Sequence, residues 1–133
     1  MREIDVAVGV IFNADQQILL TRRRADVHQG GLWEFPGGKC EASETVAEAL
    51  DRELQEELAI AVTDVQPLLE LSHDYGDKRV RLHVYSVTGF NGEPEPREGQ
   101  PMRWVCIDEL GDYAFPAANA PIVECLQLRD LPR

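Results

Sequence analysis

One amphipathic helix constrains the fold of this 133-residue chain more than any other segment. Leu50, Leu54 and Leu58 recur every four residues, which is the spacing that places apolar side chains on one helical face. Thr45 followed by Glu48 fits a capping box, so the helix is expected to begin directly after Thr45. The segment therefore predicts a surface helix whose leucine stripe (Leu50, Leu54 and Leu58) must be covered by other elements.

Three glutamates border this leucine stripe. Glu53, Glu56 and Glu57 are spaced i, i+3 and i+4, so they form a carboxylate arc along one side of the helix. Crowded carboxylates at a half-buried edge raise one another's pKa unless a cation is shared among them. Mg²⁺ or Mn²⁺ prefers such oxygen ligands and retains waters, which leaves room for substrate phosphates. The alternative is a solvated acidic face in which Arg52 joins an ordinary i, i+4 charge ladder.

The glycines in front of the helix favour the metal site, because the whole segment resembles the Nudix box. Gly38, Glu44 and the run from Arg52 to Glu57 match the pattern G-x5-E-x7-R-E-U-x-E-E-x-G-U, in which U is aliphatic. The one departure is Ala59, where the family carries glycine. If that residue ends the helix with a positive φ, alanine costs about 1 kcal/mol there.

Composition and charge narrow the classes of partner. The formal net charge of −11 disfavours a protein that grips a nucleic-acid polymer, because such binding depends on Lys and Arg. A small metal–nucleotide complex remains compatible with that charge. The N-terminus does not read as a signal peptide, and no apolar run approaches membrane-spanning length. Three cysteines without zinc-like spacing complete the prediction of a cytoplasmic protein with no membrane partner.

Alternating apolar residues predict the strands. Residues 4–12 place Ile4, Val6 and Val8 on one face, and residues 18–22 return as a second strand, expected to be antiparallel to the first. Further elements are expected as strands at 68–72, 80–88 and 102–107, a loop at 89–101, and a last helix that opens around Pro121 and buries Ile122, Val123 and Leu126.

The resemblance to the Nudix family covers nearly the full chain and is closest to its MutT-type members. It implies an α/β fold, the Nudix α/β/α sandwich, with a mixed β-sheet between the box helix and a C-terminal helix. The implied organisation is a single domain over residues 1–133, with the box at 38–60. The implied reaction is Mg²⁺-dependent hydrolysis of a nucleoside triphosphate to the monophosphate and pyrophosphate, with 8-oxo-dGTP as the expected substrate. A pyrophosphohydrolase of CTP or a modified dCTP is the alternative within the enzyme class, and a non-catalytic nucleotide-binding Nudix domain is the alternative outside that class.

The same resemblance implies roles for individual residues around the box. Either Glu53 or Glu98 acts as the catalytic base, and Arg52 orients the carboxylates. The alternative for Glu98 is a solvated acid in a loop rich in glycine and proline. The implied metal ligands are the Gly38 carbonyl and the side chains of Glu53, Glu56, Glu57 and Glu98.

Substrate contacts are expected on both sides of the box. Arg23, the middle residue of an arginine run at 22–24, matches a phosphate contact of MutT-type enzymes, and guanidinium groups bind phosphate oxygens in pairs. The alternative is the solvated end of a strand. Asn119 matches the residue that reads the nucleobase, and this role competes with a helix N-cap. The candidate walls of the base pocket are Ile4, Val6, Val8, Phe35 and Val80.

Overall fold

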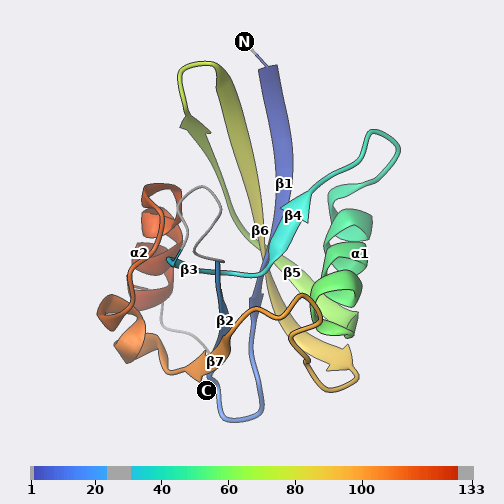
Figure 1. Ribbon diagram of the computed structural model, residues 1–133, viewed down its shortest axis with the longest axis vertical. Coiled ribbons are helices and arrows are strands. Elements are labelled where there is room, and N and C mark those ends of the chain that lie inside the picture. The colour runs from blue at the N-terminus through green and yellow to red at the C-terminus, as the bar shows by residue number, and fades with distance from the viewer. Residues whose placement is uncertain (1, 24–30, 129–133) are drawn as a thin grey trace.

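A computed structural model of the protein describes residues 2–23 and 31–128, and within these ranges the strands form two β-sheets (Figure 1). The larger sheet has the order β4 (Gly37–Lys39), β1 (Arg2–Ile11), β6 (Lys78–Asn91) and β5 (Ala61–Asp74). The smaller sheet has the order β3 (Trp33–Glu34), β2 (Ile18–Arg22) and β7 (Met102–Val105). The helical elements are α1 (Val46–Leu58), the 3₁₀ turns η1 (Ile107–Asp112) and η2 (Ala117–Asn119), and α2 (Ala120–Leu128).

Strands β1 and β6 form the parallel centre of the larger sheet. Their register runs from Arg2 opposite Lys78 to Ile11 opposite Val87. Strand β4 joins the free edge of β1, and β5 joins the free edge of β6, both in antiparallel pairing. The sheet is therefore mixed, as the sequence analysis predicts.

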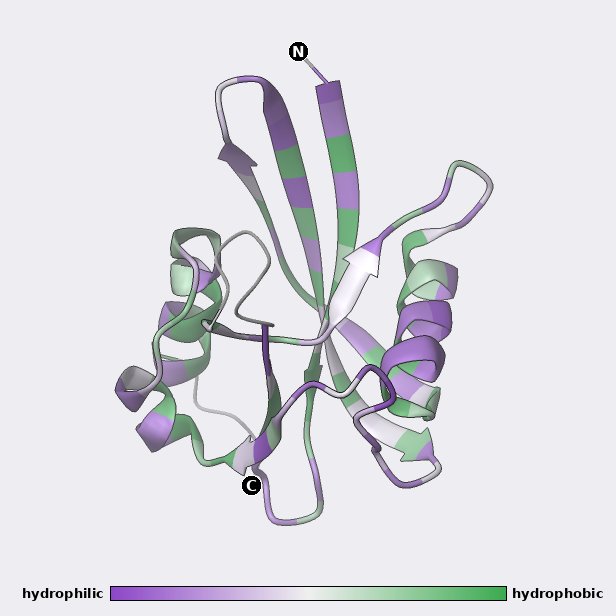
Figure 2. Cartoon of the chain, viewed as in Figure 1, coloured by the Kyte–Doolittle hydropathy of each residue, from purple (hydrophilic) through white to green (hydrophobic). Residues whose placement is uncertain are grey.

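The C-terminal half of β1 is buried on both faces. Val8 packs in an apolar cluster on the side of α2, whereas Ala7 and Ile11 pack in a second cluster with the leucine stripe of α1. Gly9 lies so close to the helix that a Cβ built on it would stand 3.3 Å from Cδ1 of Leu50. Figure 1 shows the two helices on opposite sides of the molecule, so the predicted α/β/α sandwich is confirmed. Towards their outer ends, β1 and β6 alternate between hydrophobic and hydrophilic residues (Figure 2).

Helix α1 begins where its sequence predicts. Oγ1 of Thr45 accepts a hydrogen bond from N of Glu48 at 3.1 Å, and the Glu48 carboxylate accepts one from N of Thr45 at 2.8 Å. The leucine stripe is fully buried. The helix ends at Ala59, whose φ of 61° and ψ of 31° are left-handed. The box glycine is thus replaced at the position where its conformational freedom is used.

Helix α2 covers the other side of the sheet. Ile122 and Leu126 are fully buried, and Val123 is partly buried against the same cluster. The helix has nine residues and α1 has thirteen. Neither of these described helices is long and apolar enough to cross a membrane.

The second strand is antiparallel to the first where the two meet, as expected, but in the described residues they pair at that point alone. One isolated antiparallel bridge joins Phe12 to Ile18, after which β2 pairs with β3 and β7 in the smaller sheet. The reason is that β4 and β6 already occupy both edges of β1. The strand predicted at 68–72 is also longer than expected, because it continues through the whole of β5 with register shifts around Pro67.

Candidate metal and nucleotide site

The three side chains of the carboxylate arc lie on one side of α1 and differ in how far they are exposed to solvent. The side chain of Glu53 is 19% exposed, whereas that of Glu56 is 56% exposed. Glu57 is partly buried, and its Oε2 accepts a hydrogen bond from N of Gly37 at 3.2 Å. Glu56 is therefore the most exposed residue of the arc, and Glu57 lies against β4.

Two glycines bring the backbone of β4 against its neighbours. Gly37 has a φ of 155°, and a Cβ on it would overlap the backbone of Ala7. A Cβ on Gly38 would collide with the carboxylate of Glu53. Glycine therefore allows the Gly38 backbone to stand beside that carboxylate. Backbone carbonyl and carboxylate oxygens are the ligand types that Mg²⁺ and Mn²⁺ prefer.

Arg52 holds several acidic groups in place. Its guanidinium donates to Glu44 at 2.6 and 2.9 Å, to Glu53 at 2.9 Å and to Glu56 at 3.3 Å. A further hydrogen bond at 3.1 Å runs from Arg52 to the carbonyl of Lys39. The hydrogen bonds from this guanidinium lower the pKa of Glu44 to about 2. Glu44 thus anchors the arginine, and the arginine fixes the orientation of Glu53.

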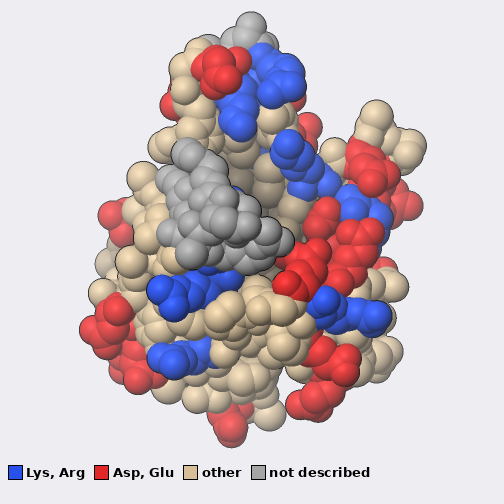
Figure 3. Space-filling view, viewed as in Figure 1, with Lys and Arg blue, Asp and Glu red and all other residues tan. Residues whose placement is uncertain are grey.

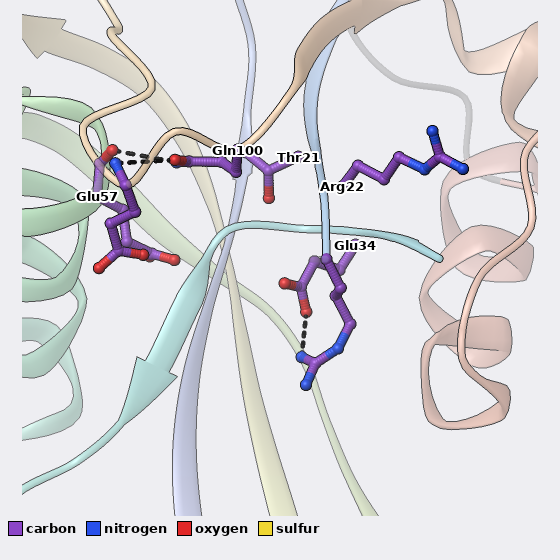
Figure 4. Close-up of a pocket in the computed structure, with 7 residues that line it drawn as sticks. Thr21, Arg22, Glu34, Glu57 and Gln100 are labelled. Atoms are coloured by element: carbon purple, nitrogen blue, oxygen red, sulfur yellow. Dashed lines mark hydrogen bonds and ion pairs between the residues drawn. The ribbon is translucent and has the colours of Figure 1, made fainter. Parts of the chain in front are cut away.

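The loop at 92–101 brings Glu98 to the same helix from the other side. N of Arg97 donates to the carbonyl of Glu57 at 3.1 Å. The side chain of Gln100 donates to that same carbonyl at 3.2 Å and accepts from N of Glu98 at 3.0 Å (Figure 4). Glu98 therefore lies between two residues that are bonded to the last turn of α1.

A polar pocket opens where β2, β3, α1 and this loop meet. Its volume is about 150 Å³, and it contains Arg23, Glu57 and Glu98, which the sequence analysis assigns to one site. Nη1 of Arg23 donates to Oε1 of Glu34 at 2.9 Å. Arg24 lies outside the described residues. Figure 3 shows acidic side chains gathered along the α1 side of this face. The complete lining consists of Thr21, Arg22, Arg23, Glu34, Glu57, Glu98 and Gln100.

The ionisation of the glutamates reflects their crowding. Burial raises the pKa of Glu57 to about 8, and the negative charges of Glu53, Glu98 and Glu34 add to this effect. Burial also raises the pKa of Glu53, although Arg52 opposes the shift. A divalent cation relieves this repulsion, so the residues fit Mg²⁺ or Mn²⁺. In the part of the chain that the structure describes, no three potential ligands already converge on one point, so the carboxylates are neighbours without forming a closed ligand shell.

Sequence analysis assigned no role to four polar residues of this pocket, which are Thr21, Arg22, Glu34 and Gln100. Glu34 lies opposite Thr21 in the pairing of β3 with β2, so its position depends on the smaller sheet. Burial raises the pKa of Glu34, while its hydrogen bond to Arg23 lowers it. The signal available in the sequence was an acidic residue in the apolar segment 32–35, directly before the glycines. Gln100 carries no comparable signal, because its role depends on the fold of the loop.

Among the predicted base-site residues, Val6, Val8, Phe35 and Val80 belong to the cluster on the α2 side, and none of them lines the polar pocket. Phe35 is 4% exposed and stacks on Phe115, with ring centroids 5.4 Å apart and an interplanar angle of 12°. Val80 is opposite Ile4 in the register of β1 with β6, and both are partly buried. Asn119 is partly buried at the end of η2. Phe35 therefore touches the segment that leads to Asn119.

The competing roles of Asn119 differ in what they require of its side chain. As an N-cap it would accept a hydrogen bond from the first turn of α2. Among the described residues it makes no such bond. Its backbone N donates to the carbonyl of Pro116 at 2.9 Å.

Comparisons with known proteins reveal relatives over nearly the whole chain. Residues 7–125 match the NUDIX domain family. The chain is 39% identical over 127 residues to the 8-oxo-dGTP diphosphatase of Escherichia coli K12, covering 96% of this chain and 98% of that protein. It is 36% identical over 124 residues to the CTP pyrophosphohydrolase of the same organism, covering 93% of this chain and 91% of that protein.

Solved structures share the same architecture. A structure from a study of MutT of Aliivibrio salmonicida and Vibrio cholerae superposes with a TM-score of 0.85 at 42% identity, covering 94% of this chain and 97% of that chain. The solution structure of the Escherichia coli ORF135 protein gives a TM-score of 0.85 at 35% identity, covering 96% of this chain and 90% of that chain. With the box residues in place and the family match extending over most of its length, this chain belongs to the Nudix hydrolase family.

Proposed function

We propose that the protein is a Mg²⁺-dependent nucleoside triphosphate pyrophosphohydrolase whose substrate is 8-oxo-dGTP. The observation that carries the reaction class is the meeting of Glu57 and Glu98 with Arg23 in one pocket, with Glu53 adjacent on α1. The substrate is supported by the relatives named 8-oxo-dGTP diphosphatase. The proposal places the reaction in the cytoplasm, on free nucleotides and not on a nucleic-acid polymer.

The residues around α1 would hold the cation. The donor set comprises the Gly38 carbonyl and the carboxylates of Glu53, Glu56, Glu57 and Glu98, with Mn²⁺ as a possible substitute for Mg²⁺. The bound cation supplies charge neutralisation and orients the phosphates. Arg52 keeps the Glu53 carboxylate in a fixed orientation through its 2.9 Å hydrogen bond. Preorganisation of this kind is what a developing negative charge requires.

The remaining residues would bind the phosphates and accept a proton. Water attacks a phosphorus atom, and the phosphoanhydride bond between the α- and β-phosphorus atoms breaks. The products are the monophosphate and pyrophosphate. Either Glu53 or Glu98 takes the proton of the attacking water. Arg23, held at 2.9 Å from Glu34 at the pocket wall, offers paired donors to phosphate oxygens. Asn119 and the apolar walls Phe35 and Val80 would contact the base.

A second candidate function is hydrolysis of CTP or a modified dCTP. It is favoured by the relative named CTP pyrophosphohydrolase, which is 36% identical over 124 residues. The box does not separate the two functions, because both relatives belong to the same fold and reaction class.

The experiment is a measurement of pyrophosphate release from a panel of triphosphates that includes 8-oxo-dGTP, dGTP, CTP and dCTP, with Mg²⁺ and with excess chelator. The proposal expects the highest kcat/KM for 8-oxo-dGTP and no turnover in chelator. The highest kcat/KM for CTP would assign the second function. Absence of hydrolysis across the panel with Mg²⁺ present would exclude both.

A further inference from the structure

The side chain of Gln100 joins the backbones of two glutamates in the predicted metal site. Its Nε2 donates to the carbonyl of Glu57 at 3.2 Å, and its Oε1 accepts from N of Glu98 at 3.0 Å. Gln100 is 8% exposed, so these bonds are shielded from water. Figure 4 shows the amide directed at the backbone of Glu57. One buried amide therefore connects α1 to the loop that carries Glu98.

The same glutamate carbonyl is also bonded from the other side of Glu98. N of Arg97 donates to it at 3.1 Å. Residues 97 and 100 thus both attach to Glu57, and Glu98 lies between the two attachment points. The position of the Glu98 backbone relative to α1 is fixed by hydrogen bonds that do not use either carboxylate. Apart from the bond that Oε2 of Glu57 accepts from N of Gly37, the two carboxylates remain available for other ligands.

The loop at 92–101 supplies hydrogen-bond donors to backbone carbonyls at the C-terminal end of α1. The last carbonyls of an α-helix have no partner within the helix. Here N of Glu95 donates to the carbonyl of Leu58 at 2.9 Å, while the carbonyl of Glu57 is served by the loop residues already described. N of Ala59, the left-handed cap, turns back to the carbonyls of Gln55 and Leu54. The loop is therefore the C-terminal cap of α1, and it is expected to move with the helix as one unit.

Glutamine is the side chain whose chemistry fits this position. The two partners are a carbonyl, which needs a donor, and an N–H, which needs an acceptor, and one planar amide supplies both. Glutamate has no donor at neutral pH, and methionine has neither group. Asparagine has the same amide on a stem that is one methylene shorter, so it reaches one partner only. The two hydrogen bonds therefore require both an amide group and a side chain of the length of glutamine.

We propose that Gln100 is a positioning residue that sets how Glu57 and Glu98 share a divalent cation. The inference deepens the proposed function and rests on it for the identity of the site. Groups that orient metal ligands from behind typically affect metal affinity or activity by about 10- to 100-fold. Gln100 itself need not touch the metal or the reacting phosphate for this effect.

The test compares Gln100→Met and Gln100→Asn with the wild type in three measurements. These are Mn²⁺ affinity without nucleotide, kcat and KM with Mg²⁺, and the hydrogen-exchange rate of the Glu98 amide. Gln100→Met should weaken Mn²⁺ binding and lower kcat by roughly 10- to 100-fold, with a smaller change in KM. Gln100→Asn should fall between Gln100→Met and the wild type. The Glu98 amide should exchange faster in both variants, because its acceptor is lost or displaced.

Gln17→Met is the matched control. Gln17 is partly buried in the turn between β1 and β2, where its Oε1 accepts from Nδ2 of Asn13 at 2.9 Å. The control loses a side-chain hydrogen bond in the same way, at a residue that does not line the pocket. It should lower the melting temperature without changing Mn²⁺ affinity or the exchange of Glu98. If Gln100→Met does not fold, the polar Gln100→Asn variant supplies the comparison.

The outcomes separate this inference from the proposed function. Wild-type Mn²⁺ affinity and wild-type Glu98 exchange in a folded Gln100 variant would overturn the positioning role, even if the enzyme hydrolyses 8-oxo-dGTP. A wild-type protein that binds Mn²⁺ but hydrolyses no triphosphate would overturn the proposed function, while the affinity series would still decide the role of Gln100. Weakened Mn²⁺ binding in Gln100→Met but not in Gln17→Met supports the inference.

Discussion

The metal side and the base side of the proposed substrate site are constructed in different ways. On the metal side, Glu53 and Glu57 belong to one helix and are fixed by Arg52 and by the backbone of Gly37. On the base side, Phe35, Val80 and Asn119 come from three separate segments, namely the β3–β4 connection, β6 and η2. Phe35 is held by apolar stacking and not by hydrogen bonds.

This difference shows how each kind of recognition depends on the sequence. Charges must be held at fixed separations, so they are placed on a regular element and leave a spacing pattern. Apolar walls depend on shape and can be supplied by many residue types, so they leave little pattern. The part of the metal side on α1 is therefore readable from one motif, whereas Glu98 and the base side are readable only through resemblance to relatives.

The largest effect is expected on the metal side, from Glu57→Gln. The change removes a charge held in place for the cation, and kcat with Mg²⁺ should fall by about 10² to 10³-fold. Glu124→Gln, at an exposed position of α2, is the control and should keep full activity. Wild-type turnover by Glu57→Gln, or full wild-type activity in excess chelator, would contradict the metal site.

Arg23→Ala tests whether Arg23 binds the phosphates of the substrate. Loss of a charge-assisted contact should cost on the order of 1.5 to 3 kcal/mol, or about 10- to 150-fold in kcat/KM. Because every triphosphate presents the same phosphates, the loss should be equal across the panel. If Arg23→Ala instead changed the order of kcat/KM among the triphosphates, Arg23 would belong with the residues that contact the base.

Asn119→Ala sharpens the comparison on the base side. An amide offers a donor and an acceptor, and N7 carries a hydrogen in 8-oxoguanine but is an acceptor in guanine. The ratio of kcat/KM for 8-oxo-dGTP over dGTP should therefore narrow by about 5- to 150-fold, or roughly 1 to 3 kcal/mol. As an N-cap, Asn119 would instead contribute about 1 kcal/mol of stability and leave the ratio intact. Melting and selectivity measured on one variant distinguish the two roles.

The metal-free protein should lose stability as pH rises. The folded-state pKa of Glu57 is raised to about 8 from 4.5, so the fold favours its protonated form. This contribution to stability is complete below about pH 4.5 and is lost as pH rises through about 8. The melting temperature in chelator should fall between about pH 5 and pH 8, and Mg²⁺ should restore it. In Glu57→Gln the slope should be flatter than in Glu124→Gln, and equal slopes would contradict the assignment.

The smallest effect is expected from Ala59→Gly, at the junction of α1 and the loop. The left-handed conformation disfavours a Cβ, so glycine should stabilise the fold by about 1 kcal/mol. Thermal melting measures this directly. An unchanged or lower melting temperature would mean that the entropy of glycine in the unfolded chain offsets the relieved strain.

Much of α1 was predictable because its determinants are local. Its capping box, leucine stripe and glutamate arc all follow from spacing within one helix. The pairing of β2 was not predictable in this way, since it depends on which strands occupy the edges of β1. The double glycine of β4 reads as a loop, and its pairing with β1 appears only in the folded sheet. Gln100 acts through contacts with a helix far away in sequence, so no local pattern marks it, whereas Glu34 stands out as an acid in an apolar segment without any indication of its partner Arg23.

The parallel pairing of β1 with β6 sets the order in which the protein is assembled. Arg2 lies opposite Lys78, so the first strand synthesised waits for most of the chain before its main partner exists. Non-local pairing of this kind slows folding and leaves an apolar strand edge exposed in the meantime. The capping box and residue spacing that define α1 are local, so this helix can begin to form before β6 exists, although its leucine stripe is covered only by packing on the sheet. A nascent chain that ends before residue 92 therefore carries the carboxylate arc without Glu98 or the loop that caps its helix, and cation binding becomes a late event of folding.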